Sequence, residues 1–127
     1  MPEKRVLIVD DDEALLRTLE RLVSSEGYEV IACSRFEEAK QYLTRETPDV
    51  LVTDVRLGLF NGLQLVFLLR EEHPDLPMIV LSAWDDPTLR KEAEKCGARY
   101  LVKPVTKQEL LQSLAEAPEV GREELIN

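Results

Sequence analysis

Three consecutive aspartates follow directly on a short apolar run near the beginning of the sequence. Residues 6–9 read Val-Leu-Ile-Val, and Asp10, Asp11 and Asp12 come next. Two carboxylates about 4 Å apart repel each other by about 4 kcal/mol at an effective dielectric constant of about 20. One aspartate, Asp11 or Asp12, is enough to cap a helix that begins near Glu13. The remaining carboxylates are better explained by a divalent cation with oxygen ligands, so the triplet indicates a metal site.

Three further residues with reactive side chains stand at the ends of later apolar runs. Asp54, Ser82 and Lys103 each follow directly on such a run. Mg²⁺ commonly binds one or two carboxylates together with water and phosphate oxygens, which suits Asp10 and Asp11. Asp54 is then either a third ligand or a nucleophile, and an aspartate nucleophile forms an acyl-phosphate. The ammonium group of Lys103 and the hydroxyl of Ser82 would contact the phosphoryl oxygens. The set therefore predicts phosphoryl-transfer chemistry.

Five apolar runs that read as strands alternate with five helical patterns, and these elements must position the reactive side chains. The strands are expected at residues 6–9, 28–33, 50–53, 78–81 and 100–102. The helices are expected at about 13–26, 34–45, 61–73, 87–96 and 106–114. Capping boxes of Ser34 with Glu37 and of Thr106 with Glu109 mark the starts of two of these helices.

The expected strands are apolar throughout instead of alternating between apolar and polar residues. Strands of this kind are buried on both faces, which is typical of a parallel sheet covered by helices on each side. Five strand–helix units of this length predict a doubly wound α/β domain. Ligands bind beyond the carboxyl ends of the strands in such sheets. The sheet would therefore bring Asp10, Asp11, Asp54, Ser82 and Lys103 to one edge.

The composition fits one domain with one core. The chain has 127 residues and a formal net charge of −9, from 25 acidic and 16 basic residues. This balance argues against direct nucleic-acid binding by this domain, because a phosphate backbone needs a basic surface. The most apolar stretch, residues 57–69, is interrupted by Gly58, Asn61, Gly62 and Gln64 and does not predict a membrane span. Charged residues lead directly into the first strand, so no secretory signal is indicated and we expect a cytoplasmic protein.

Four motifs, in order and at regular spacing, carry a resemblance to a known family. They read VLIVDDD at residues 6–12, LVTDVRLGLFNG at 51–62, VLSAW at 80–84 and YLVKP at 100–104. Over roughly residues 4–117 the chain resembles the receiver domain of two-component response regulators, in the chemotaxis-regulator-like superfamily. The resemblance implies a flavodoxin-like (βα)5 domain with a five-stranded parallel sheet of order 2-1-3-4-5. We expect the receiver domain at residues 1–117 and a C-terminal tail or the start of a linker at residues 118–127.

The resemblance also implies which residues bind the metal ion. Asp54 would be the phosphoacceptor. Asp10 and Asp11 would be the acidic pair for Mg²⁺ or Mn²⁺, with Asp11 as the direct ligand. Asp54 and the backbone carbonyl of Arg56 would complete the protein ligands of the cation.

A second group of residues would hold the phosphoryl group and pass on the signal. Ser82 and Lys103 would contact the phosphoryl oxygens. Tyr100 would be an aromatic switch that turns inward when Ser82 moves. The peptide bond before Pro104 would be cis. Phosphorylation would then change the face formed by the fourth helix, the fifth strand and the fifth helix.

The function that the resemblance implies is a phosphoacceptor switch in a two-component phosphorelay. A sensor histidine kinase or a phosphotransfer protein would donate the phosphoryl group to Asp54 in a Mg²⁺-dependent reaction. The domain would catalyse its own phosphorylation and slow dephosphorylation, without being an enzyme for other substrates. The output would pass to a partner protein or to an attached effector domain, such as a transcription regulator. A homodimer is compatible with this function, and no membrane contact is expected.

Several positions depart from the pattern of the family. Gly58 stands where a proline usually stiffens the loop after the phosphoacceptor, and glycine permits more backbone conformations. Val105 stands where an aromatic residue is frequent. Arg56 and Trp84 occupy positions that influence the access of water to the acyl-phosphate. We hypothesise that these two large side chains partly cover the acyl-phosphate and slow its hydrolysis. The alternative is that Trp84 only packs over the edge of the sheet.

Three other functions are compatible with parts of the pattern. A phosphatase with an aspartate nucleophile usually has a second acid two residues later, where this chain has Arg56. A flavin-binding domain of the flavodoxin type needs a phosphate-binding loop after the first strand, where residues 10–12 would repel phosphate. A binding module that is never phosphorylated would have no need for Asp54, Ser82 and Lys103 together.

Overall fold

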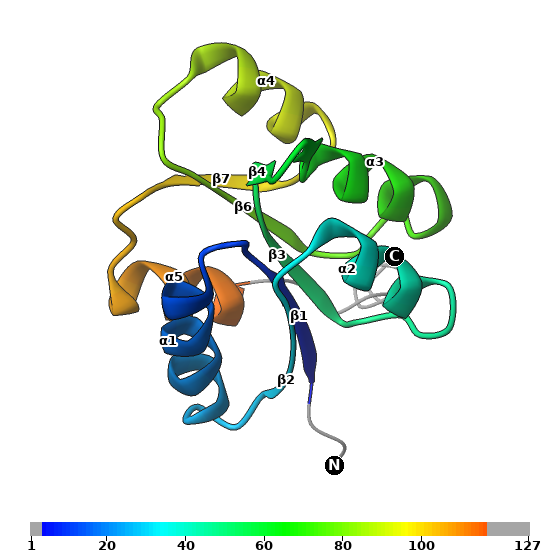
Figure 1. Cartoon of the computed structure of the whole chain (residues 1–127). Helices are drawn as coiled ribbons and strands as arrows, with labels where there is room; N and C mark the ends of the chain where they lie inside the picture. The colour runs from blue at the N-terminus through cyan, green and yellow to red at the C-terminus, as the bar shows by residue number, and fades with distance from the viewer. Residues whose placement is uncertain (1–3, 117–127) are drawn as a thin grey trace, which may run out of the picture.

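A parallel five-stranded sheet forms the centre of the domain. The computed structural model describes residues 4–116. The strands of the sheet are β1 (Arg5–Val9), β2 (Glu29–Cys33), β3 (Val50–Asp54), β6 (Met78–Ser82) and β7 (Arg99–Val102). Their order is β2-β1-β3-β6-β7, and all neighbours run parallel (Figure 1). Counted along the chain within this sheet, that is the predicted order 2-1-3-4-5, so the flavodoxin-like fold is confirmed.

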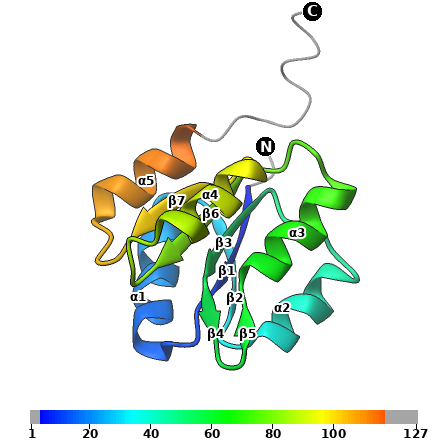
Figure 2. The same cartoon turned by 90° about the horizontal axis from the view of Figure 1, so that it is seen from above.

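Helices cover both faces of the sheet. Within the described residues they are α1 (Glu13–Ser24), α2 (Phe36–Leu43), α3 (Leu63–Glu72), α4 (Pro87–Lys95) and α5 (Lys107–Glu116). The helices α1 and α5 pack on one face, and α2, α3 and α4 pack on the other. In Figure 2, seen from above, α1 and α5 lie on one side of the sheet and α2 and α3 on the other, while α4 is drawn across β6 and β7. The doubly wound architecture predicted from the apolar strands is therefore present.

The central strand β1 shows why its sequence is apolar at every position. Val6 and Ile8 pack with residues of α1 and α5, whereas Leu7 and Val9 pack with residues of α2, α3 and α4. All four side chains are at most 1% exposed. Successive side chains of a strand point to opposite faces of the sheet. A strand with helices on both sides therefore needs apolar residues along its whole length, and β1 ends at Val9, directly before Asp10.

Two of the predicted helix starts agree with the structure. Asp12 is the N-cap of α1, and its side chain accepts a hydrogen bond from the backbone N–H of Leu15 at 3.1 Å. The capping box of Thr106 with Glu109 is confirmed. The backbone N–H of each of these two residues donates to the side chain of the other at 3.1 Å. Such caps pair backbone N–H groups that the first turn of a helix leaves without a partner.

The predicted capping box of Ser34 with Glu37 is wrong by one residue. The helix α2 spans residues 36–43, so Arg35 occupies the N-cap position and Glu38 the third helical position. Glu38 therefore reaches back, and its Oε1 accepts a hydrogen bond from the backbone N–H of Ser34 at 3.2 Å. The helix also ends earlier than residue 45, the predicted end.

The sequence patterns do not predict the short antiparallel hairpin between β3 and α3. Its strands are β4 (Arg56–Leu57) and β5 (Phe60–Asn61), and Gly58 turns the chain with a φ of +64°. The ring of Phe60 stacks on the ring of Phe36, with 4.6 Å between the centroids. Strands of two residues have no measurable periodicity, so pattern analysis cannot detect them. The hairpin brings Gly58 to the same edge of the sheet as the aspartates of residues 10–12.

Two further expectations concern the membrane and the end of the chain. Within residues 4–116, no helix is both long enough and apolar enough to cross a membrane. The expected tail or linker at residues 118–127 lies outside the described residues.

Gly62 lies where the chain passes closely over the end of β3. A Cβ atom on Gly62 would collide with the backbone carbonyl oxygen of Asp54 and lie 2.8 Å from Oγ1 of Thr53. The backbone N–H of Gly62 donates to the carbonyl of Val55 at 2.6 Å, so the segment cannot move aside without weakening that bond. We predict that Gly62→Ala lowers the free energy of unfolding by about 3 kcal/mol through overpacking, as measured by urea denaturation.

Gly27 offers a matched control for this substitution. Its φ is +95°, and a Cβ atom there would meet nothing within 4 Å. Gly27→Ala should therefore cost only the strain of a left-handed backbone, about 1 kcal/mol. A loss of stability in Gly62→Ala that does not exceed the loss in Gly27→Ala would contradict the role of close packing at Gly62.

Candidate functional site

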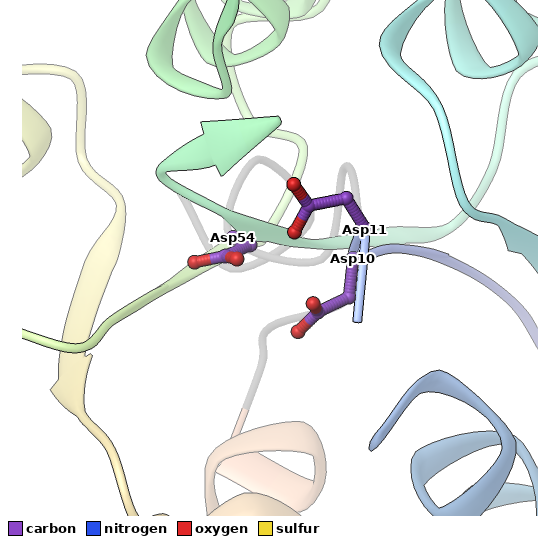
Figure 3. A group of neighbouring side chains, drawn as sticks. All are labelled: Asp10, Asp11 and Asp54. Carbon is purple, nitrogen blue, oxygen red and sulfur yellow. The ribbon is translucent and has the colours of Figure 1, made fainter. Parts of the chain in front are cut away.

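Three carboxylates from two neighbouring strands meet at the carboxyl edge of the sheet. Asp10 and Asp11 follow β1, and Asp54 is the last residue of β3 (Figure 3). One carboxylate oxygen of each residue lies within 4.8 Å of those of the other two. Asp10 and Asp54 are buried, whereas Asp11 is exposed. The register of the sheet causes this meeting, because Val9 pairs with Thr53 and the next residues of both strands are acids.

Lys103 lies between the two buried carboxylates. Its Nζ donates a hydrogen bond to Oδ2 of Asp10 at 3.0 Å and lies 3.3 Å from Oδ2 of Asp54. Burial by itself lowers the pKa of Lys103, but the hydrogen bond to Asp10 and the charge of Asp54 outweigh it and raise the pKa above its ordinary value. The ammonium group therefore remains protonated, and it offsets part of the repulsion between the carboxylates.

Backbone N–H groups orient the two acids that follow β1. The N–H of Asp12 donates to Oδ1 of Asp10 at 2.9 Å, so hydrogen bonds engage both oxygens of Asp10. The N–H of Gly58 donates to Oδ2 of Asp11 at 3.1 Å. The resemblance implied Asp11 as the direct metal ligand, and its exposed carboxylate is accessible for that role.

The carboxyl group of Asp54 is more basic than an ordinary aspartate. Its pKa is raised from 3.8 to about 6, first by burial and then by the charge of Asp10, while Lys103 acts in the opposite direction. Burial and the neighbouring carboxylate therefore favour the protonated form of Asp54 in the metal-free site. Any positive charge added to the site would favour the ionised carboxylate.

Ser82 and Tyr100 lie on the two strands that follow β3 in the sheet. Oγ of Ser82 accepts a hydrogen bond from the backbone N–H of Trp84 at 3.1 Å, which leaves the hydroxyl hydrogen of Ser82 available for donation. The hydroxyl of Tyr100 donates to the backbone carbonyl of Trp84 at 2.7 Å, and Tyr100 is only 4% exposed. The resemblance implied a ring that turns inward, and in this structure the ring already lies inward.

The remaining predicted residues lie just beyond the carboxyl ends of β3, β6 and β7. Arg56 and Trp84 are both exposed, on the hairpin strand β4 and on the loop after β6. The peptide bond between Lys103 and Pro104 is cis, as predicted. The structure thus brings Asp10, Asp11, Asp54 and Lys103 into one cluster, while Ser82 bonds to its own loop.

Two contacts of the site were missed by sequence reasoning. The first is the pairing of Lys103 with Asp10, since the sequence predicted only a contact of Lys103 with phosphoryl oxygens. The second is the hydrogen bond from Gly58 to Asp11. A signal for the second was available, because glycine has a backbone N–H at this position and the proline usual in the family has none.

The donor set fits a divalent cation that prefers oxygen ligands. Carboxylate oxygens are the protein ligands that Mg²⁺ commonly takes, and an exposed edge leaves room for the waters that it retains. Three carboxylates and one ammonium group leave two formal negative charges without compensation, which is the charge that one such cation would neutralise. Asp11 is the exposed member of the three, which suits the entry of an ion from solvent.

The raised pKa of Asp54 predicts a pH-dependent loss of stability in the metal-free protein. The folded state binds the proton of Asp54 more tightly than the unfolded state, so stability is highest below the ordinary pKa and falls as pH rises through about 6. Asp54→Asn removes the ionisation. We expect it to raise the free energy of unfolding by on the order of 1 kcal/mol at pH 7.5, in urea denaturation with EDTA.

The same substitution should have a smaller effect at pH 4.5, because this pH lies between the ordinary pKa of 3.8 and the raised pKa of about 6, where only part of the loss of stability has occurred. A stabilisation of equal size at both pH values would show that burial of the ionised carboxylate is not its cause. Asp75→Asn is a suitable control, because Asp75 is exposed in the turn between α3 and β6. Its replacement should leave the free energy of unfolding unchanged at both pH 7.5 and pH 4.5.

Comparison with known proteins gives matches over nearly the whole chain. A family model of the response regulator receiver domain matches residues 6–115. The chain is 40% identical over 108 residues to the response regulator MprA of Mycobacterium leprae, covering 84% of this chain and 47% of that protein. It is 34% identical over 115 residues to the transcriptional regulatory protein GlrR of Escherichia coli K12, covering 90% of this chain and 26% of that protein. The chain thus spans half or less of the length of these curated relatives.

Solved structures agree with the fold. A CheY-like response regulator receiver domain protein from Methanospirillum hungatei superposes with a TM-score of 0.85 and 28% identity, covering 91% of this chain and 93% of the other. The non-phosphorylated HemR receiver domain from Leptospira biflexa gives a TM-score of 0.84 and 29% identity, covering 91% and 94%. The likeness extends over almost the full length of both receiver structures.

Proposed function

The chain belongs to the response regulator receiver domain family, and on this premise we propose that it is a phosphorylation switch whose phosphoacceptor is Asp54. The observation that carries the proposal is the cluster of Asp10, Asp11 and Asp54 around the ammonium group of Lys103. A structural role alone gives no reason to gather three acids at the edge of a sheet, since their repulsion costs stability.

The proposed reaction transfers a phosphoryl group to a carboxylate oxygen of Asp54. The donor is a phosphohistidine of a sensor histidine kinase or of a phosphotransfer protein. The oxygen–phosphorus bond forms as the phosphorus–nitrogen bond breaks, and the imidazole leaves with the bonding electron pair and takes up a proton. Asp54 must be ionised to attack, and the neighbouring Lys103 favours that state. Lys103 and the hydroxyl of Ser82 then donate hydrogen bonds to the phosphoryl oxygens.

Mg²⁺ or Mn²⁺ would be held by Asp10, Asp11, Asp54 and the backbone carbonyl of Arg56. When bound, the cation supplies positive charge opposite the oxygens of the transferring phosphoryl group. Asp10 keeps the ammonium group of Lys103 beside Asp54 through its hydrogen bond at 3.0 Å. Asp11 keeps its orientation through the N–H of Gly58.

The signal would leave through the face formed by α4, β7 and α5. Tyr100 on β7 and the loop before α4 are both joined to Ser82 through Trp84, so a change at Ser82 reaches this face directly. The relatives include proteins named as response regulators and transcriptional regulators. We therefore place the output in an effector domain or partner protein of that kind, with a homodimer as a compatible form and the cytoplasm as the location.

Incubation with acetyl phosphate and Mg²⁺ tests the proposed reaction directly. We expect intact-mass spectrometry to show one added phosphoryl group on the wild-type chain, because a small acyl phosphate can replace the kinase as donor. The adduct should be absent in Asp54→Asn and in the presence of EDTA. It should persist in Asp75→Asn, since Asp75 lies in the turn before β6 and outside the cluster.

Two results would contradict the proposal. One is an adduct that survives the Asp54→Asn substitution, which would place the phosphoryl group on another residue. The other is the absence of any adduct with acetyl phosphate, phosphoramidate and a phosphorylated histidine kinase, which would favour a binding module that is not phosphorylated.

The exposed ring of Trp84 provides a prediction about the lifetime of the acyl-phosphate. Trp84 is 59% exposed and is the second residue after Ser82. If its ring limits the access of water, Trp84→Ala should speed hydrolysis of phosphorylated Asp54 by about threefold. The decay of the phosphorylated mass over time measures the rate. Trp84→Phe keeps an aromatic ring and should stay close to wild type, and an unchanged or longer lifetime in Trp84→Ala would rule out shielding.

A further inference from the structure

The side chain of Arg90 on α4 connects Tyr100 to the loop that follows Ser82. Its guanidinium carbon lies 4.8 Å from the centroid of the Tyr100 ring. Its Nη2 donates a hydrogen bond to Oδ1 of Asp85 at 3.0 Å. The side chain of Asp85 is 73% exposed, so this ion pair by itself contributes little. The contact of the guanidinium with the buried ring is the stronger of the two, because a cation over an aromatic face gains most where water is excluded.

Tyr100 is therefore held at its face and at its hydroxyl. Arg90 covers the face, and the backbone carbonyl of Trp84 accepts the hydrogen bond of the hydroxyl at 2.7 Å. The backbone N–H of Trp84 in turn donates to Oγ of Ser82 at 3.1 Å. These contacts form an unbroken path from α4 through the ring of Tyr100 to the hydroxyl at the proposed phosphorylation site.

We infer that Arg90 is a positioning residue that holds Tyr100 inward and keeps the loop of residues 83–86 against Ser82. Without the guanidinium, the ring loses the cation over its face and keeps its hydroxyl contact and its packing in the core. The fraction of molecules with an outward ring then rises. The loop then loses the partner that fixes the carbonyl of Trp84. The hydroxyl of Ser82 then becomes less well oriented, because it accepts its hydrogen bond from the backbone N–H of Trp84, the residue whose carbonyl is no longer fixed.

The inference has a structural part and a kinetic part. The structural part concerns only the position of Tyr100 in the unphosphorylated chain. The kinetic part rests on the proposed function: a less well oriented Ser82 hydroxyl donates less effectively to the phosphoryl oxygens, so the loss of Arg90 slows phosphorylation of Asp54 without abolishing it.

Hydroxyl-radical footprinting of the unphosphorylated chain in EDTA tests the structural part. Arg90→Met keeps much of the apolar stem and removes the charge. We expect Tyr100 to be labelled about threefold faster in this variant, because the contact that is lost is worth at least that ratio of inward to outward rings. Labelling of Tyr28, on the other face of the sheet, serves as the reference within each molecule. Arg90→Lys keeps a cation but lacks the planar group, and it should give an intermediate rate.

Arg17→Met is the matched control. Arg17 lies on α1, pairs with Glu20 at 3.7 Å and is 71% exposed, so its loss removes an arginine ion pair without a ring contact in the described structure. The rate at which Tyr100 is labelled in Arg17→Met should equal the rate in wild type. The same rate of Tyr100 labelling in wild type and Arg90→Met, or an equal increase in Arg17→Met, would overturn the inference.

Phosphorylation by acetyl phosphate with saturating Mg²⁺ tests the kinetic part. We expect the Asp54 adduct to form about threefold more slowly in Arg90→Met than in wild type or Arg17→Met. Faster labelling of Tyr100 in Arg90→Met, together with an unchanged rate of adduct formation at Asp54, would overturn the positioning role of Arg90 in phosphorylation. If wild type itself formed no adduct, the proposed function would fail, while the footprinting comparison would still decide whether Arg90 holds Tyr100.

Discussion

The ammonium group of Lys103, held between the carboxylates of Asp10 and Asp54, is the contact on which the arrangement of the site depends. The two acids sit on adjacent strands with little access to water, and without a positive charge between them their burial would cost several kcal/mol. Lys103 and Asp10 are 93 residues apart in the sequence, directly after strands β7 and β1, which do not pair. The cluster therefore forms only when β1, β3 and β7 have all assembled into the sheet.

This dependence places stability and chemistry in opposition. Burial keeps the carboxyl of Asp54, the nucleophile in the proposed reaction, away from bulk water and raises its pKa. The same burial destabilises the folded chain whenever Asp54 is ionised, and the large apolar core on both faces of the sheet has to compensate. The position of Asp54 is set by register and not by its own interactions, since β3 pairs with β1 on one side and β6 on the other.

Sequence reasoning was accurate where a residue follows directly from strand position and inaccurate where the contact depends on a neighbouring element. Asp10 and Asp54 could be placed because apolar runs mark where buried strands end. The capping box at Ser34 was misplaced by one residue, because serine is a favoured N-cap residue, whereas the helix begins one residue later behind Arg35, which makes no side-chain cap hydrogen bond. The ring contact of Arg90 has no local signal at all, since it joins a helix to a strand that follows it in the chain.

The bond from Tyr100 to the loop after β6 ends on a main-chain carbonyl and not on a side chain. The bond from the same loop residue to Ser82 also uses a main-chain atom, its N–H. Both contacts are therefore indifferent to the side chain at position 84. Proline alone would remove the bond to Ser82, because it has no N–H, while its carbonyl could still accept the bond from Tyr100. Substitutions at position 84 can therefore change how far its side chain covers the site, while the main-chain link between Ser82 and Tyr100 stays in place.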